Sequence, residues 1–503
     1  MSNIWFHPAK SIEKIASSVA KECFGGEFDA SVRAADPRFA DFQINGALPF
    51  AKKAKKNPRE VASNFVEELK KSGRFDESLV EISIAGPGFV NFKLSAEFLL
   101  KWLGRYKGEA ALKDAAKSFY NGKKVVIDFP SPNTAKQMHV GHLRPMVIGE
   151  TIQRLLRFCG ADMICDNHIG DWGTNFGILI YGIKSENYKL DPENENALED
   201  LERMYKAGSA KAKEDPSCAD AARDELVKLQ NGDAENTKLW NDIVKISKIS
   251  FDKMYERMSL TIDTTLGESF YRDKVGRIYD ELTEIGLACE DQGALVVFLK
   301  DHERFAKQPF IIRKKDGASN YASTDLATVL YRVEHFGAEE IVYVTDGRQQ
   351  DHFQQLFLTV GKWFAAKGYR KPELRHVWFG TILGEDGKAI KTKSGEPVKL
   401  KSLLDEAVAR AEKIVLAKTP DMPKDEIKKI AETVGVGALR YADLSQNRSG
   451  DYVFSWDKML AFEGNTAPYL LYAVARIHSI FRKIGVQENS DFENDAANLE
   501  TPQ

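Results

Sequence analysis

The sequence has few cysteines and no long apolar run. Its 503 residues include five cysteines, which are widely spaced and contain no Cys-x-x-Cys pair. This pattern argues against a disulfide framework and a zinc ribbon and favours a reducing compartment, so we expect a cytoplasmic protein. No stretch of about 18 or more apolar residues occurs, and we therefore expect neither a transmembrane helix nor a membrane partner.

An excess of charge of one sign is also missing. The chain has 71 lysines and arginines against 74 aspartates and glutamates, a net charge of -3. A global basic field is therefore excluded, and any contact with nucleic acid must depend on a local patch. Hydrophobic residues make up 43% and charged residues 29%, which excludes a mostly disordered or collagen-like chain. The N-terminal residues carry interspersed charges, so we expect an ordinary helix over about 11–23 and no signal peptide.

Residues 1–115 are predicted to form a separate α+β domain. A helix beginning at Pro58 and ending at Lys71 is indicated by its first-position proline and its periodicity. Strands are indicated at 39–45, 80–84 and 89–94, the last two flanking the turn Gly86-Pro87-Gly88.

A basic run lies inside this first domain. It contains Lys52, Lys53, Lys55 and Lys56, within the string AKKAKKNPR. Charge runs are usually solvated surface, whereas the alternative is a contact with a phosphate backbone. Both interpretations stay open at this point.

Residues 116–400 alternate between strand and helix patterns. Short apolar runs typical of buried strands occur at 123–129, 163–167, 341–345 and 377–383. Helices are predicted over Leu143–Phe158 and Gln349–Lys367. The strand–helix–strand order predicts an α/β fold with a Rossmann-type parallel sheet.

Two further segments are predicted to be helical. Residues 191–260 are highly charged and poor in aromatics, which favours a surface-exposed helical insertion. Residues 401–455 read as a helical connecting region, and 456–503 as the beginning of a further helical domain.

The segment from Asp128 to His142 joins the first strand of the core to its first helix. Open α/β sheets bind ligands beyond the carboxyl ends of their strands, and a helix N-terminus attracts phosphate. Gly141 lacks a Cβ, so a base or a ribose can approach its backbone. His139 and His142 are spaced so that both can face one phosphate chain, although an isolated histidine pair would more often be capping or surface residues.

The string His139-Val140-Gly141-His142 resembles the HIGH signature of class I aminoacyl-tRNA synthetases. The longer string SPNTAKQMHVGHLR resembles the arginyl-tRNA synthetase version. Further segments that resemble this family follow in collinear order, at 167–177, 267–271, 321–327, 345–353 and 463–469. Phe42-Gln43 and the turn at 86–89 are similar to the family's additional N-terminal domain. The ordered set spans nearly the whole chain, so 116–400 is expected to be a class I catalytic domain.

This resemblance implies amino-acid activation by ATP. The substrate carboxylate attacks the α-phosphorus and is already ionised at neutral pH, so catalysis needs positioning and charge stabilisation rather than a general base. His139, Gly141 and His142 would contact ATP, and His352 would approach the adenosine unless it is an ordinary helix-surface histidine. Mg²⁺ is expected as a diffusible companion of ATP, without a resident metal site or a tightly bound cofactor.

The second class I signature, the KMSKS loop, departs from its usual form. Its counterpart is Ala389-Ile390-Lys391-Thr392-Lys393-Ser394-Gly395, where Thr392 stands in place of the second lysine. Family members with such loops are thought to use a lysine ahead of the HIGH motif, a position that Lys136 fits. The pyrophosphate role is therefore open among Lys136, Lys391 and Lys393, and a solvated loop is the alternative for the last two.

Recognition of arginine requires carboxylates, because a guanidinium is a planar fork of five donors that stays charged. The resemblance implies that Glu268, Tyr321 and Asp325 bind the guanidinium, and that Asp128, Asn133 and Gln349 bind the α-amino end. Tyr321 and Asp325 are four residues apart and share a face if they lie on a helix. A structural ion pair or a helix cap is the alternative for any single acidic residue.

The function that follows is formation of arginyl-adenylate from L-arginine and ATP, then transfer to the 2′-OH of the 3′-terminal adenosine of arginine tRNA. In this family the first step usually needs bound tRNA. Lys52, Lys53, Lys55, Lys56 and Arg476 are the candidate tRNA contacts, and a monomer is expected. Only 35 residues follow Pro468, so we expect a reduced or truncated anticodon-binding bundle over 456–503. The alternatives are a class I enzyme for another amino acid, or a catalytically silent RNA-binding relative.

Overall fold

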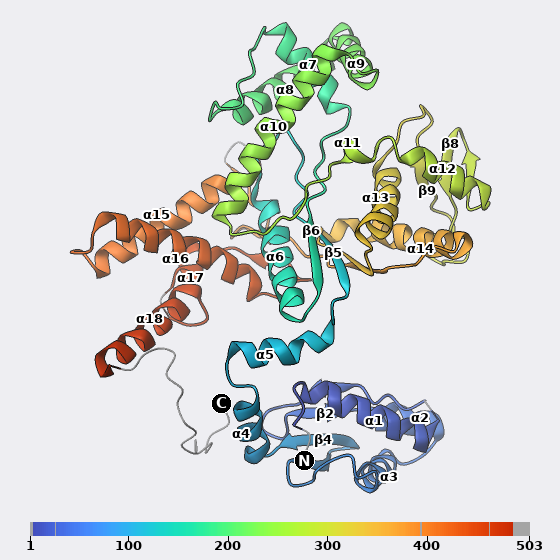
Figure 1. Ribbon diagram of the computed structural model, residues 1–503, viewed down its shortest axis with the longest axis vertical. Coiled ribbons are helices and arrows are strands. Elements are labelled where there is room, and N and C mark those ends of the chain that lie inside the picture. The colour runs from blue at the N-terminus through green and yellow to red at the C-terminus, as the bar shows by residue number, and fades with distance from the viewer. Residues whose placement is uncertain (1–3, 26, 393–394, 462, 486–503) are drawn as a thin grey trace. The chain divides into compact units, whose positions relative to one another are not determined.

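The computed structural model describes residues 4–25, 27–392, 395–461 and 463–485, and the chain divides into two units (Figure 1). The first unit ends at Phe119 and the second begins at Tyr120. Each has its own hydrophobic core, and each is described here by itself.

The first unit is a four-stranded antiparallel sheet with five helices. The strand order is β1-β2-β4-β3, with bounds Val32–Ala34, Phe42–Ile44, Phe89–Leu94 and Val80–Ala85. The helices are α1 Pro8–Phe24, α2 Ala47–Ala54, α3 Pro58–Lys71, α4 Ala96–Arg105 and α5 Gly108–Ala116. Helix α3 has the predicted bounds because the Asn57 side chain caps its first turn and Pro58 follows. Gly88 in the predicted turn has φ +136°, and a Cβ there would lie 2.8 Å from the Pro58 carbonyl oxygen.

The second unit contains a four-stranded parallel sheet, which confirms the predicted α/β class. Its order is β11-β10-β5-β6, with bounds Glu373–His376, Glu340–Tyr343, Lys124–Asp128 and Asp162–Asp166. Helix α6, Leu143–Phe158, connects β5 to β6, and helix α14, Gln350–Lys367, connects β10 to β11. The chain therefore leaves the centre of the sheet in opposite directions, which makes the carboxyl ends of β5 and β10 a topological switch point.

The predicted strand over 377–383 is only partly correct. The regular sheet strand is the polar segment Glu373–His376, which ends just before it. Beyond it the Val377 N–H still donates to the Tyr343 carbonyl at 2.8 Å and Phe379 forms a single bridge with Asp346, and Ile382–Leu383 form β12 with β13, Tyr452–Val453. A charged edge strand is tolerated because one side of it faces solvent, where Arg375 pairs with Glu340 and Glu373. The apolar run is instead used for packing, since Phe379 is buried among the β5 side chains.

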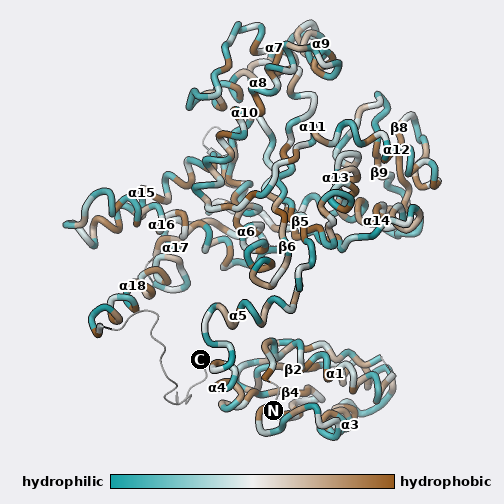
Figure 2. Tube along the Cα trace, viewed as in Figure 1, coloured by the Kyte–Doolittle hydropathy of each residue, from teal (hydrophilic) through white to brown (hydrophobic). Residues whose placement is uncertain are grey.

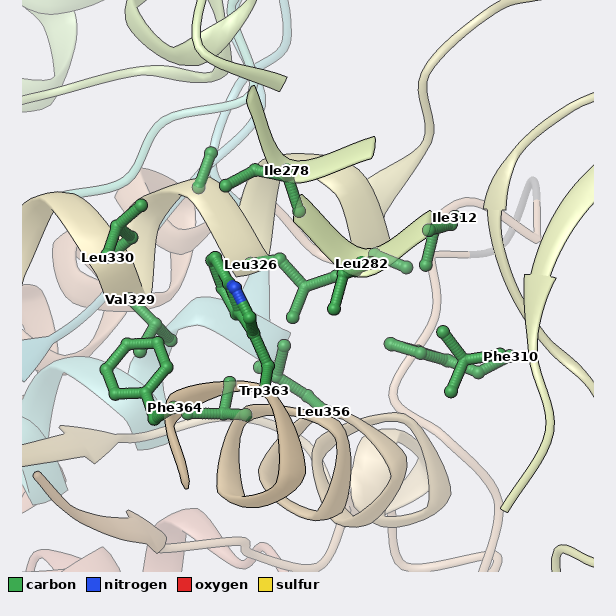
Figure 3. Packing of buried hydrophobic residues seen from close by; sticks show 14 of the residues in the cluster. Ile278, Leu282, Phe310, Ile312, Leu326, Val329, Leu330, Leu356, Trp363 and Phe364 are labelled. Carbon is green, nitrogen blue, oxygen red and sulfur yellow. The ribbon is translucent and has the colours of Figure 1, made fainter. Parts of the chain in front are cut away.

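Helices surround this sheet, and the largest core cluster lies between α13, Tyr321–Phe336, and α14. Figure 3 shows Trp363 and Leu356 of α14 packed against Leu326 and Val329 of α13. The same cluster includes a small antiparallel sheet of β7 Ala288–Asp291, β8 Ala294–Val297 and β9 Phe310–Arg313, with α11 Glu268–Tyr271 and α12 Val275–Glu284. This packing fixes α13, which carries several of the predicted site residues.

The helical insertion and the C-terminal helices were both predicted. The insertion consists of α8 Ala197–Glu214, α9 Pro216–Gln230 and α10 Ala234–Arg257, next to α7 Asn175–Ser185. The C-terminal helices are α15 Leu400–Lys418, α16 Lys424–Leu444, α17 Trp456–Met459 and α18 Ala467–Ile484. Figure 2 shows hydrophobic and hydrophilic residues interleaved along α18, where Val474, Ile477 and Ile480 are each 51% exposed. None of the helices in the described part of the chain is both long and apolar enough to cross a membrane.

Candidate active site

A cavity of about 540 Å³ opens at the switch point, beyond the carboxyl ends of β5 and β10. We call it the sheet pocket. Its walls come from the loop after β5, the loop after β10, and helices α11, α13 and α14. The pocket brings together nine residues that the sequence singled out: Asp128, Asn133, Gly141, His142, Glu268, Tyr321, Asp325, Gln349 and His352.

One end of the sheet pocket is acidic. Glu268 is the first residue of α11, and Asp171 holds this short helix by accepting hydrogen bonds from the Ser269 N–H and hydroxyl, at 2.8 and 2.7 Å. Burial raises the pKa of Glu268 to about 7; His168 opposes the shift, and the neighbouring carboxylates of Asp325 and Asp171 add to it. Among the described residues, the Glu268 side chain has no ion-pair partner. A cation of the right shape would therefore find an uncompensated carboxylate here.

Asp325 and Tyr321 face the same pocket from α13. The Asp325 carboxylate lies 2.5 Å from His352 Nε2 on α14, and Tyr321 stands at the rim with 71% of its surface exposed. Burial lowers the pKa of His352, but the hydrogen bond to Asp325 and its charge outweigh this effect and raise the pKa. His352 therefore lines the sheet pocket and contacts Asp325 there.

Asp128 belongs to a buried charge cluster below the pocket. The Arg332 guanidinium donates to Asp128 at 2.6 Å and to Asp166 at 2.8 Å, and all three side chains are buried. The other oxygen of Asp128 accepts the Ser131 hydroxyl at 2.6 Å. The sequence predicts that Asp128 binds the α-amino group of the substrate. In the structure this carboxylate is already paired with Arg332, so the ammonium group and Arg332 would share it. The sequence analysis did not predict a role for Arg332. Its position, seven residues after Asp325 and therefore on the same face of α13, was the one available signal.

Removing Arg332 is expected to destabilise the second unit strongly. Arg332→Met leaves two buried carboxylates without their cation, which typically costs about 3–5 kcal/mol. Denaturant unfolding should detect this loss. Arg304→Met is the matched control, because Arg304 is 62% exposed in its pair with Asp351 and should cost about 1 kcal/mol or less. Equal effects of the two substitutions would contradict the role given to Arg332.

The two signature histidines lie on a 3-10 turn at the start of α6. The His139 ring accepts the Gly141 N–H through Nδ1 at 3.1 Å, and the His139 N–H donates to Nδ1 of His142 at 3.1 Å. Burial, and then the nearby His139, lower the pKa of His142 to about 4, so its ring is neutral at pH 7. Nδ1 of His142 also lies 3.3 Å from the His139 carbonyl oxygen, to which it would donate in the other tautomer. In the tautomer in which Nδ1 accepts the His139 N–H, Nε2 carries the proton and can donate a hydrogen bond to a phosphate.

A second cavity, of about 620 Å³, adjoins the first and shares Asn133 and His142 with it. We call it the loop pocket. It is lined by His139 and Lys136, by Thr392 and residues 396–399 of the second signature loop, and by Glu202, Tyr205 and Lys206 of α8. The predicted surface-exposed insertion is thus wrong in one respect, because one face of α8 is a pocket wall.

The lysines of the loop pocket differ from those expected. Lys136 lines it, with its ammonium 5.2 Å from the centre of the Tyr205 ring. Lys391 is exposed and lines neither pocket, and Lys393 lies outside the described residues. Lys206 and Lys399 also line the cavity and were missed, because Lys206 sits in a segment whose charge pattern reads as solvated surface.

The candidate tRNA contacts lie outside both pockets. Lys52 and Lys53 are exposed in the last turn of α2, where Lys53 pairs with Glu27 at 3.0 Å, and Lys55 and Lys56 follow, also exposed. On α18, Arg476 donates to the Tyr472 hydroxyl at 3.1 Å. Their exposure is compatible with phosphate contacts and does not distinguish these from a solvated surface.

Comparisons with known proteins point to one family. The family model described as the catalytic domain of class I (R) tRNA synthetases matches residues 109–456, and the arginyl-tRNA synthetase N-terminal domain matches 9–94. An arginine–tRNA ligase of Fusobacterium nucleatum is 44% identical over 470 residues, which cover 92% of this chain and 79% of that protein. A second one, of Laribacter hongkongensis, is 45% identical over 457 residues, covering 90% and 78%.

Solved structures give the same result. The arginyl-tRNA synthetase of Plasmodium falciparum superposes with a TM-score of 0.77 at 31% identity, over 97% of this chain and 82% of the other. That of Thermus thermophilus shares the fold, with a TM-score of 0.73 at 23% identity over 96% and 83%. Because both family models match in order and the relatives align over at least nine-tenths of its length, the chain belongs to the arginyl-tRNA synthetase family.

Proposed function

We propose that the sheet pocket holds L-arginine and the adenosine of ATP, and that the loop pocket holds the departing phosphates. As an arginyl-tRNA synthetase, the protein activates arginine with ATP to arginyl-adenylate and charges arginine tRNA, releasing pyrophosphate and AMP. The roles of individual residues below are our proposals.

The acidic end of the sheet pocket is the observation that carries the substrate assignment. Glu268 and Asp325 approach it from two different helices, so that a guanidinium could bridge both carboxylates. Tyr321 at the rim would add a hydroxyl partner. Lysine would present a point charge that cannot use both carboxylates in a planar fork. Asn133 and Gln349 would orient the α-amino end. Asp128 would attract it more weakly than a free carboxylate would, because it is also paired with Arg332.

The ATP side requires charge stabilisation and no proton acceptor. In-line attack of the arginine carboxylate on the α-phosphorus breaks the bond to pyrophosphate, so negative charge accumulates on the leaving group. His139 and His142 would donate hydrogen bonds to the phosphates, and Gly141 would let the nucleotide approach the backbone. His352, which lines the same pocket, would contact the adenosine.

Lys136 is the strongest of the three candidates for the pyrophosphate role. It lines the loop pocket next to His139, whereas Lys391 does not line it and Lys393 is not described. Mg²⁺ would enter with ATP, and we assign it no protein ligand. We further propose Lys52, Lys53, Lys55, Lys56 and Arg476 as tRNA contacts, and a monomeric enzyme that works in the cytoplasm.

An uncharged analogue tests the carboxylate site directly. Citrulline has nearly the shape of arginine but a neutral urea group, so it would leave the Glu268 carboxylate without a cation in the occupied pocket. Its kcat/KM in ATP–pyrophosphate exchange should fall by about three orders of magnitude or more relative to arginine. Exchange with citrulline within tenfold of arginine would contradict the assignment of Glu268 and Asp325.

The KM for arginine is expected to fall as the pH rises through about 7. Glu268, whose pKa is about 7, gains its negative charge over this range. His352, whose pKa is raised by Asp325, loses its proton at a higher pH than a free imidazole does and then releases that carboxylate to the substrate. Both changes favour a guanidinium that stays charged, and each gives at most about a tenfold change per pH unit. Exchange kinetics between about pH 6 and 8 measure this, and a KM that is constant or rises would contradict it.

A further inference from the structure

One face of helix α8 in the insertion is polar and reaches both signature loops. Its residues Glu199, Glu202 and Lys206 recur at helical spacing and therefore lie along one side. Glu202 accepts a hydrogen bond from Gln137, in the first signature loop, at 3.1 Å. Glu199 lies 3.8 Å from Lys399, after the second signature loop. The insertion thus touches the two loops that carry the phosphate chemistry.

The opposite face of α8 anchors it. Leu198, Leu201 and Met204 are buried in the apolar cluster of the insertion, and Gly208 is buried beside Ile178 of α7. The polar face is therefore held by packing on its back. Contacts made from this face can act as a fixed support for a neighbouring loop.

The contact closest to the second signature loop is an ion pair. Lys206 Nζ lies 3.4 Å from Glu396 Oε2 and 3.4 Å from Glu202 Oε1 on its own helix. The Glu396 carbonyl accepts both the N–H of Thr392, at 2.7 Å, and its hydroxyl, at 3.1 Å. Glu396 therefore makes two kinds of contact: its carbonyl bonds Thr392 within the loop, and its carboxylate pairs with Lys206 of the insertion.

We propose that the Lys206–Glu396 ion pair positions the described pocket-lining part of this region, Thr392 and residues 396–399, at the wall of the loop pocket during amino-acid activation. Both residues line that pocket, together with His139 and His142. Thr392 is joined to the pair through the Glu396 carbonyl, which accepts its N–H and its hydroxyl. Lys206 and Glu396 are positioning residues in this account, and their role rests on the proposed function of the pocket.

Charge reversal of each partner tests the pair. Lys206→Glu and Glu396→Lys should each lower kcat/KM for ATP in exchange by about tenfold, since attraction becomes repulsion at a half-exposed site. The double variant restores attraction and should recover activity to within about threefold of the unmodified protein. The KM for arginine and the melting temperature should change little, which separates positioning from a loss of folding. Lys211→Glu, on the same helix but outside both pockets, is the control and should be fully active.

Two results would overturn the inference. The single variants could be as active as the unmodified protein, or the double variant could be no better than the weaker single one. The second result would mean that each side chain acts by itself on the phosphates. If the unmodified protein showed no arginine-dependent exchange with tRNA present, the proposed function would fail first, and the inference with it.

Discussion

Glu268→Gln is expected to lower kcat/KM for arginine by about two to three orders of magnitude, because removing one charge of a desolvated pair costs about 2–5 kcal/mol. The substitution keeps the shape of a side chain that has no ion-pair partner among the described residues, and removes its charge. The loss should appear mainly in KM, since the guanidinium is remote from the reacting carboxylate. Steady-state exchange with varied arginine measures it.

Two control variants sharpen this prediction. Glu268→Asp keeps the charge and should retain more activity than Glu268→Gln. Glu303→Gln removes an exposed carboxylate outside the pocket and should have no effect. If Glu268→Gln kept the KM of the unmodified protein, the guanidinium would have to bind elsewhere.

His142→Ala is expected to reduce kcat for exchange by about 100- to 1,000-fold, the usual loss when one donor to a developing negative charge is removed. The reason is that His142 is a neutral imidazole that lines both pockets, and its Nε2 donates to a phosphate in the tautomer in which Nδ1 accepts the His139 N–H. Its pKa of about 4 also predicts that kcat has no inflection from this residue between about pH 6 and 9. The KM for arginine should stay within about threefold, because the acidic end of the pocket is untouched.

His335→Ala serves as its control. His335 is exposed on α13, outside both pockets, and stacks on Tyr331. It should leave kcat unchanged. A His142→Ala variant with normal kcat would mean that the phosphates are held without the signature turn.

Elements with local signals were predictable from the sequence. Helix α3 carries a capping asparagine and a first-position proline, and β5, α6 and β6 have clear apolar patterns, so their bounds agree with the structure to within about two residues. The run 377–383 misled because the regular pairing lies just before it, on the polar edge strand Glu373–His376. Its own apolar residues form only a two-residue strand, Ile382–Leu383, and Phe379 is used for packing. The small sheet of β7, β8 and β9 was missed, since its strands are only four residues long.

Some residues of the candidate site were predictable from the sequence and others were not. His142 and Glu268 were predicted because each belongs to a short run of characteristic residues, which forms a turn or the start of a helix. Arg332, Lys206 and Lys399 depend on contacts between segments far apart in the chain, and such contacts leave no local pattern. Asp128 illustrates the limit, because its buried partner Arg332 is 204 residues away.

We expect the two pockets together to activate arginine. Pyrophosphate exchange into ATP, measured with arginine, lysine or glutamate and with or without total tRNA, follows this step. Exchange is expected with arginine and tRNA, and none with lysine or glutamate. Exchange driven by another amino acid, or none with arginine when tRNA is present, would show that these pockets do not activate arginine.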